Sequence, residues 1–554
     1  MRTSGGLLVA SAPSRSTPWW RDAVCYQIYV RSFADADGDG VGDLRGITAH
    51  LDYLERLNVD ALWLTPFYTS PQADHGYDVA DYRDVDPLFG TLADFDEMLA
   101  GAHARDLRVI VDLVPNHTSS AHPWFVAALA DGPDSAARKR YLFRDGRGPD
   151  GAEPPNNWQS VFGGPAWTRV PDPSTGSGHR GQWYLHLFDP EQPDLNWDDP
   201  DVGDEFESVL RFWLDRGVDG FRVDVAHGLF KETGMPDVRG GAGTGPTLDD
   251  TMSQWDRPYW DQPGVHDVYR RWRQVLDSYP GDRMMIGEAW VGSPESMAQY
   301  VRADEMNQVF NFHWLSTPFS APALRDVIAE TYAAVGPVGA TPTWVLSNHD
   351  VVRTVTHYGG GDLGLARAKA SMLAMLALPG SAYVYQGEEL GLPQVDVAPA
   401  DRQDPTWLRG GGVGRDGCRV PLPWSGQAPP FGFSPDSPQP VRTWLPQPGW
   451  FRDYTVERES HDPFSTLSFM RYAIARRRGL VDRLSHELEM LDRGDDVVAF
   501  RRAGVDGAPG LVCVVNCGTV DVPVDDLGTA VVLSSALAEG TGQLLPDSAA
   551  WFLS

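Results

Sequence analysis

Eight short apolar runs, most of them separated by helix-like stretches, constrain the fold of this chain more than any other feature. Amphipathic segments such as ITAHLDYLERLN and EFESVLRFWLDRG lie between them. Strands that alternate with such helices indicate a parallel sheet, and eight of them suggest closure into a barrel. The runs are VCYQIYVRSF (24–33), ALWLTPF (61–67), RVIVDLVPNH (108–117), GFRVDVAH (220–227), MMIGEAW (284–290), QVFNFHW (308–314), TWVLSNHD (343–350) and AYVYQGEEL (382–390).

Polar residues gather at the carboxyl ends of these runs. Each run begins with apolar residues and then acquires His, Asp, Glu, Asn or Arg. A strand that is buried on both faces has no structural use for an ionisable end, whereas a (β/α)8 barrel assembles its active site there. We therefore predict an α/β fold built on a (β/α)8 TIM barrel, with an active site at the carboxyl ends of its strands.

The barrel pattern is interrupted once and ends before the chain does. Residues 118–184 are rich in Gly, Pro, Asn and Trp, which predicts a small subdomain inserted after the third strand. After residue 480, short alternating apolar runs with turns between them predict a C-terminal antiparallel β domain. The predicted domains are a barrel of residues 16–117 and 185–478, an inserted subdomain of residues 118–184 and a β domain of residues 479–554.

Composition narrows the class of partner. The formal net charge of −30 argues against nucleic acid, whose phosphates an acidic surface repels, and against an anionic membrane surface. The four cysteines form no CxxC pair, the apolar patch near the amino terminus is too short for a secretory core, and no apolar run reaches membrane-spanning length. We expect a cytoplasmic protein that acts on a small neutral molecule. The sequence leaves its oligomeric state open.

Three carboxylates stand at strand ends: Asp224, Glu288 and Asp350. Arg222 lies two positions before Asp224, so both side chains point to one face of a strand, and the guanidinium is expected to lower the pKa of this nucleophile. Glu288 lies in an apolar segment beside Trp290, where desolvation is expected to raise its pKa toward that of a general acid. Two carboxyls with separated pKa values are what glycoside cleavage requires.

Five segments carry a resemblance to a known family. In order, they are DLVPNH (112–117), QPDLNW (192–197), GFRVDVAH (220–227), IGEAW (286–290) and LSNHD (346–350). With these segments the chain resembles the α-amylase superfamily of glycoside hydrolases (glycoside hydrolase family 13), in its oligo-1,6-glucosidase and α-glucosidase branch. The resemblance covers roughly residues 18–425. It implies Asp224 as nucleophile, Glu288 as acid/base and Asp350 as the residue that stabilises the transition state.

The resemblance also implies a subsite for the non-reducing glucose. Arg222, His117 and His349 are expected to line it. The segment HGYDVADY (75–82) matches the family's segment after the second strand, so Asp78 is expected to hydrogen-bond the terminal hydroxyls of that glucose. The segment GRDGCRVPLPW (414–424) resembles a family segment beside the substrate, and both of its arginines are candidates there: Arg415 and Arg419.

The segment DADGDGVGD (35–43) follows the first strand and has the ligand order of a calcium loop. Closely spaced carboxylates repel one another unless a cation joins them. Gly46 stands where an EF-hand has its bidentate Glu, so the loop is not an EF-hand proper. The resemblance also implies a structural Ca²⁺ here, far from the chemistry, and Mg²⁺ is an alternative. The predicted ligands are Asp35, Asp37, Asp39, Val41 and Asp43.

The predicted function is that of a retaining exo-acting α-glucosidase, which hydrolyses short α-1,4- or α-1,6-linked glucosides from the non-reducing end. A transglucosylase or a sucrose or maltose isomerase on the same scaffold is the alternative, because it shares the covalent intermediate and differs only in the acceptor. A non-catalytic binding subunit is a remote third possibility, since such relatives lose the carboxylates. In this branch, valine after the nucleophile tends to accompany α-1,6 preference, and Val225 therefore predicts a partial preference for isomaltose over maltose.

Overall fold

The computed structural model describes residues 17–132, 135–170, 181–239, 257–438, 441–528, 530–538 and 542–554, together with the short strand β1 (Leu7–Leu8). Its centre is a sheet of eight parallel strands, in the order β12-β11-β10-β6-β3-β2-β14-β13. The amide of Asn311, just after β12, donates to Thr343 of β13 at 3.3 Å and joins the two ends of the sheet. The strands are β2 (Val24–Ile28), β3 (Ala61–Leu64), β6 (Arg108–Leu113), β10 (Gly220–Val223), β11 (Met284–Gly287), β12 (Gln308–Val309), β13 (Thr343–Val345) and β14 (Ser381–Tyr385). The predicted barrel is confirmed, and each of its strands lies within one of the eight apolar runs or begins one residue before it.

The alternation of side chains along the strands explains why the runs are apolar throughout. Along β2, Val24, Tyr26 and Ile28 belong to the large cluster that includes the surrounding helices, whereas Cys25 packs with Trp63 in a second, inner cluster. Because side chains of a strand alternate between two faces, both faces of these strands are buried. Because of the same alternation, polar side chains near the strand ends point toward the inside of the barrel.

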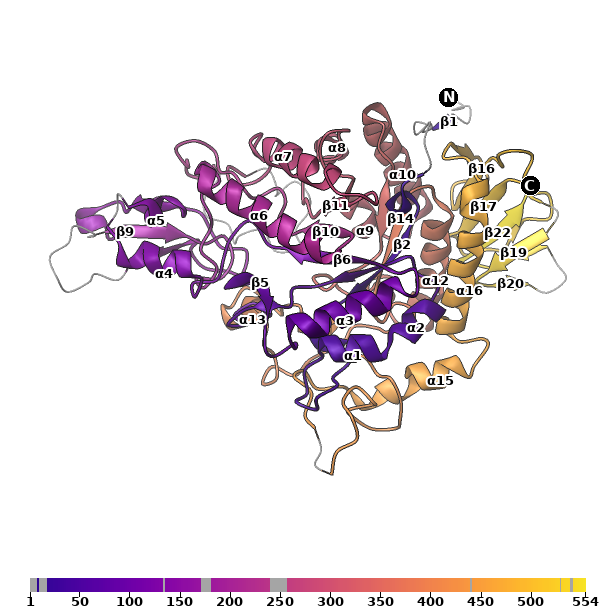
Figure 1. The fold of residues 1–554 in the computed structure, drawn as a ribbon. Coiled ribbons are helices and arrows are strands. Elements are labelled where there is room, and N and C mark those ends of the chain that lie inside the picture. The colour runs from indigo at the N-terminus through magenta and orange to yellow at the C-terminus, as the bar shows by residue number, and fades with distance from the viewer. Residues whose placement is uncertain are drawn as a thin grey trace.

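Helices surround the barrel, and local sequence fixes their ends (Figure 1). The helix α3 begins with a capping box between Thr91 and Asp94. The helix α6 begins at an Asp199 cap and ends at Gly217, whose φ of 103° favours glycine. The longer helices are α3 (Leu92–His103), α6 (Pro200–Arg216), α7 (Val265–Asp277), α10 (Ala321–Val335), α12 (Gly361–Ala377) and α16 (Thr466–Leu480).

A small sheet projects from the barrel between β6 and β10 (Figure 1). Its three antiparallel strands are β7 (Phe143–Asp145), β9 (Gln182–Leu185) and β8 (Trp167–Arg169), in that spatial order, and the helices α4 (Pro123–Ala130) and α5 (Ala136–Lys139) accompany them. Residues 171–180, within the predicted subdomain, lie outside the described residues. The insertion after the third barrel strand therefore brings its own sheet to the barrel.

The C-terminal region forms an antiparallel sheet in the order β1-β15-β16-β17-β22-β19. This sheet confirms the antiparallel β fold that the sequence predicted for the region. Its first member, β1, comes from the amino-terminal end of the chain, and Leu7 pairs with Glu489; the sequence did not suggest this pairing. Trp551 donates to the carbonyl of Leu373 at 3.0 Å, which fixes the sheet to α12. The remaining strands are β15 (Leu488–Leu491), β16 (Val497–Arg502), β17 (Leu511–Asn516), β19 (Ala530–Ser534) and β22 (Ser548–Leu553). Among the described helices, none combines the length and the apolar character that crossing a membrane requires.

Candidate active site

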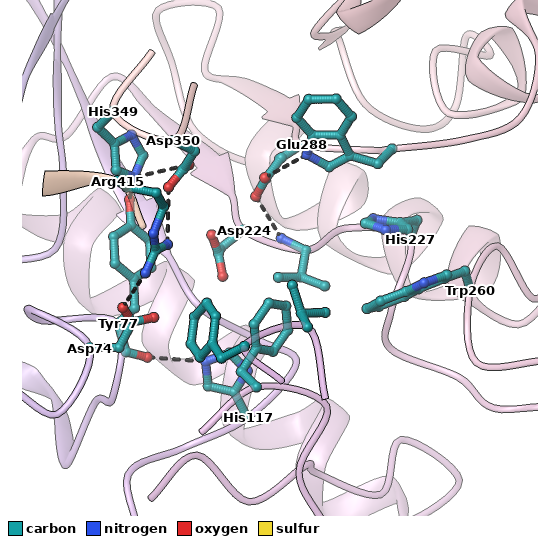
Figure 2. A pocket seen from close by; sticks show the side chains of 15 residues that line it. Asp74, Tyr77, His117, Asp224, His227, Trp260, Glu288, His349, Asp350 and Arg415 are labelled. Carbon is teal, nitrogen blue, oxygen red and sulfur yellow. Dashed lines mark hydrogen bonds and ion pairs between the residues drawn. The ribbon is translucent and has the colours of Figure 1, made fainter. Parts of the chain in front are cut away.

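A pocket of about 540 Å³ lies at the carboxyl ends of the barrel strands (Figure 2). Residues that follow β3, β6, β10, β11, β13 and β14 meet there with Val161 and Phe162 of the inserted subdomain and with Phe188, which follows β9. This is the location that the polar strand ends predict. The pocket is lined by Asp74, Tyr77, His117, Val161, Phe162, Phe188, Asp224, Val225, His227, Trp260, Glu288, Trp290, His349, Asp350 and Arg415.

Three nearly buried carboxylates face this pocket. Asp224 directly follows β10, Glu288 directly follows β11, and Asp350 lies beyond β13. Their side chains are 8%, 9% and 9% exposed. Figure 2 shows Asp224 between Glu288 on one side and Asp350 with Arg415 on the other. The residual exposure faces the pocket, so all three groups can reach a bound molecule.

Arg222 holds two of these carboxylates together. Its Nη1 lies 2.6 Å from Asp224 Oδ1 and 2.8 Å from Asp112 Oδ1, and its Nη2 lies 2.6 Å from Glu288 Oε2. The register of β10 and β6 pairs Arg222 with Asp112, which places both side chains in the same layer of the barrel. A buried guanidinium that reaches three carboxylates fixes their positions, because each charge depends on the others for compensation.

The pKa of Asp224 is set by opposing influences. Burial raises the pKa of this carboxyl well above its usual range, the positive charge of Arg222 lowers it, and the neighbouring charges of Glu288 and Asp112 raise it. The predicted effect of Arg222 therefore has the right sign, but burial outweighs it. The negative charges of Glu288 and Asp112 thus oppose the ionisation of Asp224.

Asp350 is held ionised by its surroundings. Burial alone would raise its pKa, but His349 and the guanidinium groups of Arg415 and Arg419 lower that pKa below the ordinary range. Arg415 Nη1 lies 3.1 Å and Arg419 Nη2 lies 2.8 Å from Asp350 Oδ1. A permanently charged carboxylate at this position can accept hydrogen bonds from hydroxyl groups and stabilise a developing positive charge.

A clamp opposite Glu288 connects separate loops. Arg415 Nη2 lies 2.8 Å from Asp74 Oδ1, which links the loop after β14 to the loop after β3. Tyr77 stacks on His349 at 5.4 Å between ring centroids, and its hydroxyl lies 2.7 Å from His349 Nε2. Burial lowers the pKa of His117 to about 4 and that of His349 well below its usual value, so both rings are neutral hydrogen-bonding groups near pH 7.

Comparison with known proteins agrees with this geometry. Residues 27–484 match the family model described as the α-amylase catalytic domain. The chain belongs to the α-amylase family of glycoside hydrolases.

Two relatives and one solved structure of this family illustrate the range of activities around the chain. A probable α-glucosidase of Rhizobium meliloti (strain 1021) is 38% identical over 510 residues, which cover 90% of this chain and 89% of the relative. The trehalose-6-phosphate hydrolase of Escherichia coli (strain K12) is 40% identical over 388 residues, which cover 68% of this chain and 66% of the relative. The crystal structure of the α-glucosyl transfer enzyme XgtA superposes with a TM-score of 0.86 at 36% identity, covering 97% of this chain and 100% of that chain.

Most of the predicted site residues of this α-amylase family member come together. His117 and His349 line the pocket, and so does Arg415 rather than Arg419. Arg222 and Arg419 lie just behind the lining, where they bind the carboxylates.

Asp78 is the exception among the predicted residues. It does not line the pocket, because its two carboxylate oxygens accept hydrogen bonds from the amides of Ala73 and Asp74, both at 2.9 Å. Asp74, four residues earlier in the same segment, points into the pocket in its place (Figure 2). The sequence signal was present, but it did not distinguish between two aspartates so close together.

The structure adds residues to which the sequence analysis assigned no role. They include the buried partners Asp112 and Asp404, and the aromatic lining supplied by Phe162, Phe188 and Trp260. Asp404 lies in the Gly- and Pro-rich stretch after β14, where no periodic pattern marks it. Only the three-dimensional contacts reveal these roles.

The acidic loop after β2 gathers carboxylates as its spacing suggested. One ligand atom from each of Asp35, Asp37 and Asp39 lies within 4.8 Å of the others. Asp43 instead caps α1 (Leu44–Ala49): its oxygens accept from the amides of Gly46 at 2.6 Å and Ala36 at 2.8 Å. Since Asp35, Asp37 and Asp39 bring their ligand atoms together and Asp43 does not belong to this group, the first three aspartates are the better candidates for cation ligands.

Proposed function

We propose that this protein is a retaining, exo-acting α-glucosidase that hydrolyses short α-linked glucosides. The observation that carries this proposal is the Arg222 bridge, which holds Asp224 and Glu288 at one guanidinium within the pocket. Retaining enzymes need two carboxyls about 5–5.5 Å apart. The clamp between Asp74 and Arg415 supports exo action, because it joins the loops after β3 and β14 on the side of the pocket opposite Glu288, where a longer sugar chain would otherwise continue.

In the proposed mechanism, Glu288 donates its proton to the glycosidic oxygen while a carboxylate oxygen of Asp224 attacks the anomeric carbon. The bond to the leaving sugar breaks, and a glucosyl ester of Asp224 remains. Glu288, now ionised, takes a proton from a water molecule, whose oxygen displaces Asp224 and releases glucose. Asp350 stabilises the positive charge that develops on the sugar ring in both steps.

The substrate is proposed to be uncharged. Among the described residues that line the pocket, Arg415 is the only arginine or lysine, and it is ion-paired with Asp74, Asp350 and Asp404. A sugar phosphate needs a cation that is available to its phosphate group. A net charge of −30 disfavours an anionic substrate as well. These features argue against a phosphorylated substrate such as the trehalose 6-phosphate for which one relative is named.

Glucosyl transfer is a second candidate, favoured by the likeness to the α-glucosyl transfer enzyme XgtA. It uses the same glucosyl ester, with a sugar hydroxyl instead of water as the acceptor. Product analysis with maltose, isomaltose, sucrose, trehalose, kojibiose and nigerose separates the two functions. Release of free glucose as the main product supports hydrolysis, and formation of new oligosaccharides or isomers as the main product supports transfer.

The nucleophile and the stereochemistry can be tested directly. Asp224→Asn keeps the volume of the side chain but cannot attack, so kcat should fall by about 10³-fold or more while the fold is retained. NMR during early turnover should show the α-anomer of glucose first. A β-anomer that appears first, or an Asp224→Asn variant with the wild-type rate, would refute the double displacement.

We also propose that the loop of Asp35, Asp37 and Asp39 binds a structural Ca²⁺, with Mg²⁺ as the alternative. Carboxylate and carbonyl oxygens are the ligands that these ions prefer. Burial and the neighbouring aspartates raise the pKa of Asp39, as expected for crowded carboxylates that a cation would stabilise. No catalytic step is assigned to this ion.

We propose a cytoplasmic location. The four cysteines are free, and Cys25, Cys418 and Cys513 are buried. Unpaired thiols are the rule in a reducing compartment.

A further inference from the structure

Gln27 is a buried polar residue of β2 to which no role has been given. It lies two positions after Cys25, which packs inside the barrel, so its side chain also points into the barrel. Gln27 is 1% exposed, and among the described residues its carboxamide makes one hydrogen bond, in which Nε2 lies 2.6 Å from His349 Nδ1. Burying an amide costs free energy that an apolar side chain of the same length would avoid. Packing alone therefore does not account for glutamine at this position.

The other ring nitrogen of His349 faces two oxygen atoms. Nε2 lies 2.7 Å from the hydroxyl of Tyr77 and 3.3 Å from Oδ2 of Asp350. An ionised carboxylate only accepts hydrogen bonds, so the contact with Asp350 is favourable when Nε2 carries a proton. Burial lowers the pKa of His349 well below its usual value, so the ring is neutral near pH 7 and has a single proton. A proton on Nε2 therefore leaves Nδ1 as an acceptor.

Tyr77 supports the same position for the proton. Its hydroxyl also lies 3.1 Å from Oδ2 of Asp112, the carboxylate that pairs with Arg222. Burial raises the pKa of Tyr77 well above its usual value, so the hydroxyl keeps its one proton. If that proton is donated to Asp112, the oxygen of Tyr77 accepts from His349 Nε2. If it were donated to Nε2 instead, the oxygen of Tyr77 would face the carboxylate of Asp112 with no proton between them.

This tautomer makes Gln27 the donor to the ring. Because Nδ1 accepts, the hydrogen-bond network requires that the amide nitrogen of Gln27, and not its amide oxygen, faces His349. Within the described part of the chain, no other group hydrogen-bonds Nδ1. In the opposite tautomer, Nδ1–H would meet the amide hydrogens of Gln27, and the lone pair of Nε2 would meet the carboxylate of Asp350. Both contacts would be repulsive.

We propose that Gln27 is a positioning residue, which holds His349 in the tautomer that carries its proton on Nε2. The proposal rests on the function proposed above and adds to it a residue that acts on the terminal glucose through His349. His349 lines the pocket beside Asp350, so its Nε2–H is a donor on the glucose side of the pocket (Figure 2). When a sugar binds, this donor can serve one of its hydroxyl oxygens, whereas the opposite tautomer would offer a lone pair there.

The kinetic test is Gln27→Met, which keeps the approximate length of the side chain but cannot donate to Nδ1. Loss of a hydrogen bond of this kind corresponds to about a tenfold lower kcat/KM. The factor should be the same for maltose and for α-glucosyl fluoride, because His349 acts on the glucose that both substrates share. The matched control is Gln308→Met, at a 1% exposed glutamine of β12 whose amide donates to Ser381 and to the carbonyl of Trp20. It should leave kcat/KM unchanged below its melting temperature.

The tautomer itself is measured by NMR. The ¹⁵N chemical shifts of His349 are recorded in protein labelled with ¹⁵N-histidine, and His349→Asn assigns its signals. The wild-type protein should show a protonated Nε2 and an unprotonated Nδ1 near pH 7. In Gln27→Met the Nδ1 signal should move, because the donor is gone and the opposite tautomer becomes more populated. In Gln308→Met both signals should stay in place, which separates the role of Gln27 from a general effect of losing a buried glutamine.

A protonated Nδ1 in the wild-type protein would overturn the proposal. Wild-type kcat/KM in Gln27→Met, or an Nδ1 signal that does not move in this variant, would overturn it as well. Should Gln27→Met fail to fold, as thermal melting would show, the wild-type spectrum still decides which nitrogen of His349 carries the proton. Absence of activity on every α-glucoside in the wild-type protein would instead refute the proposed function, and the spectrum does not depend on that activity.

Discussion

Asp404 accepts two hydrogen bonds from Arg415, one from Nε at 2.6 Å and one from the backbone amide at 3.0 Å, through the same carboxylate oxygen. The carboxylate of Asp404 is fully buried. The other face of the guanidinium contacts Asp74 and Asp350, the two carboxylates on the glucose side of the pocket. Asp404 therefore orients the guanidinium of Arg415 toward Asp74 and Asp350, although Asp404 does not line the pocket.

This relationship predicts that Asp404→Asn weakens binding of the terminal glucose. The amide removes the charge that orients Arg415, and a hydrogen bond to a charged group contributes about 1.5–3 kcal/mol. We expect kcat/KM to fall about ten- to a hundredfold, mainly through a higher KM, in steady-state kinetics on maltose. The control is Asp396→Asn in the same loop, whose carboxylate is 97% exposed and contacts only Arg402 at 3.4 Å. A loss carried by kcat alone, or an equal loss in the control, would contradict the positioning role.

The fold and the three central carboxylates were predictable because the buried residues of a barrel strand and the polar residue at its carboxyl end lie next to each other in the sequence. Apolar residues that end in Asp224 or Glu288 show both the strand and its catalytic end. Asp74 was not separable from Asp78, since the choice depends on which carboxylate the backbone amides of the loop occupy. A sequence pattern carries no information about such loop geometry.

Other parts of the site depend on contacts between distant segments. Asp404 is linked to Asp350 through Arg415 and, at a longer distance, through Arg419, and Trp260 packs against the turn after Asp224 because Gly228 leaves room for it. The pairing of β1 with β15 is similar, because a strand of two residues has no detectable period. Each of these features requires the folded chain before it can be recognised.

The effect of the Glu288 charge on the pKa of Asp224 predicts a specific pH dependence. The acid limb of kcat/KM reports the ionisation of the nucleophile in the free enzyme, and it should lie above the ordinary carboxyl value of about 3.9. Burial and the charge of Glu288 both raise the pKa of Asp224. Glu288→Gln removes that charge, so the pKa of Asp224 should fall and the limb should move to lower pH, by about one unit or more.

The measurement uses α-glucosyl fluoride, because its departure needs no acid and kcat/KM then reports the first step alone. The matched control is Glu295→Gln, a carboxyl-to-amide change at an exposed position of α8 (Pro294–Gln299). It should leave the limb where it is. A limb that stays in place or rises in Glu288→Gln would show that the charge of Glu288 does not raise the pKa of Asp224.

The acidic loop predicts a response to chelation. If a cation binds to Asp35, Asp37 and Asp39 in the folded state only, its removal should lower the melting temperature by a few degrees through mass action. Turnover below that temperature should change little, since no catalytic residue belongs to the loop. Ca²⁺ and Mg²⁺ are then added back in separate samples, and the ion that restores the melting temperature is the one that the loop binds.

The matching variant for this loop is Asp37→Asn. Both oxygens of Asp35 accept backbone amides, from Gly38 at 2.6 Å and Gly40 at 2.8 Å, so substitution of Asp35 would disturb the loop itself. Asp37 accepts only the amide of Asp39, at 3.2 Å, and its carboxylate is exposed. Asp37→Asn should abolish the effect of chelation. A melting curve that is unchanged after verified metal removal from the wild-type protein would leave the loop as an acidic turn.

Val225 carries the prediction about linkage. It follows the nucleophile, lines the pocket and donates its amide to Glu288 Oε2 at 3.1 Å. Its φ of 45° is unusual for a β-branched residue, so the backbone here is strained and its side chain has little freedom to move away from the leaving sugar. An α-1,6 link has an additional rotatable bond, which allows that sugar to avoid the side chain more easily than an α-1,4 link does.

Val225→Thr should therefore shift the ratio of kcat/KM toward maltose and away from isomaltose. Threonine keeps the β-branched backbone strain but replaces one γ-methyl group with a smaller hydroxyl group, which reduces the crowding of the leaving sugar. A contact of this size contributes about 1–3 kcal/mol, which makes the preference partial rather than absolute. The control is Val520→Thr, a 70% exposed valine of the C-terminal domain, which should leave the ratio unchanged. A ratio that does not move in Val225→Thr would mean that this valine serves only to pack the turn against Trp260, and that the linkage preference is set elsewhere in the pocket.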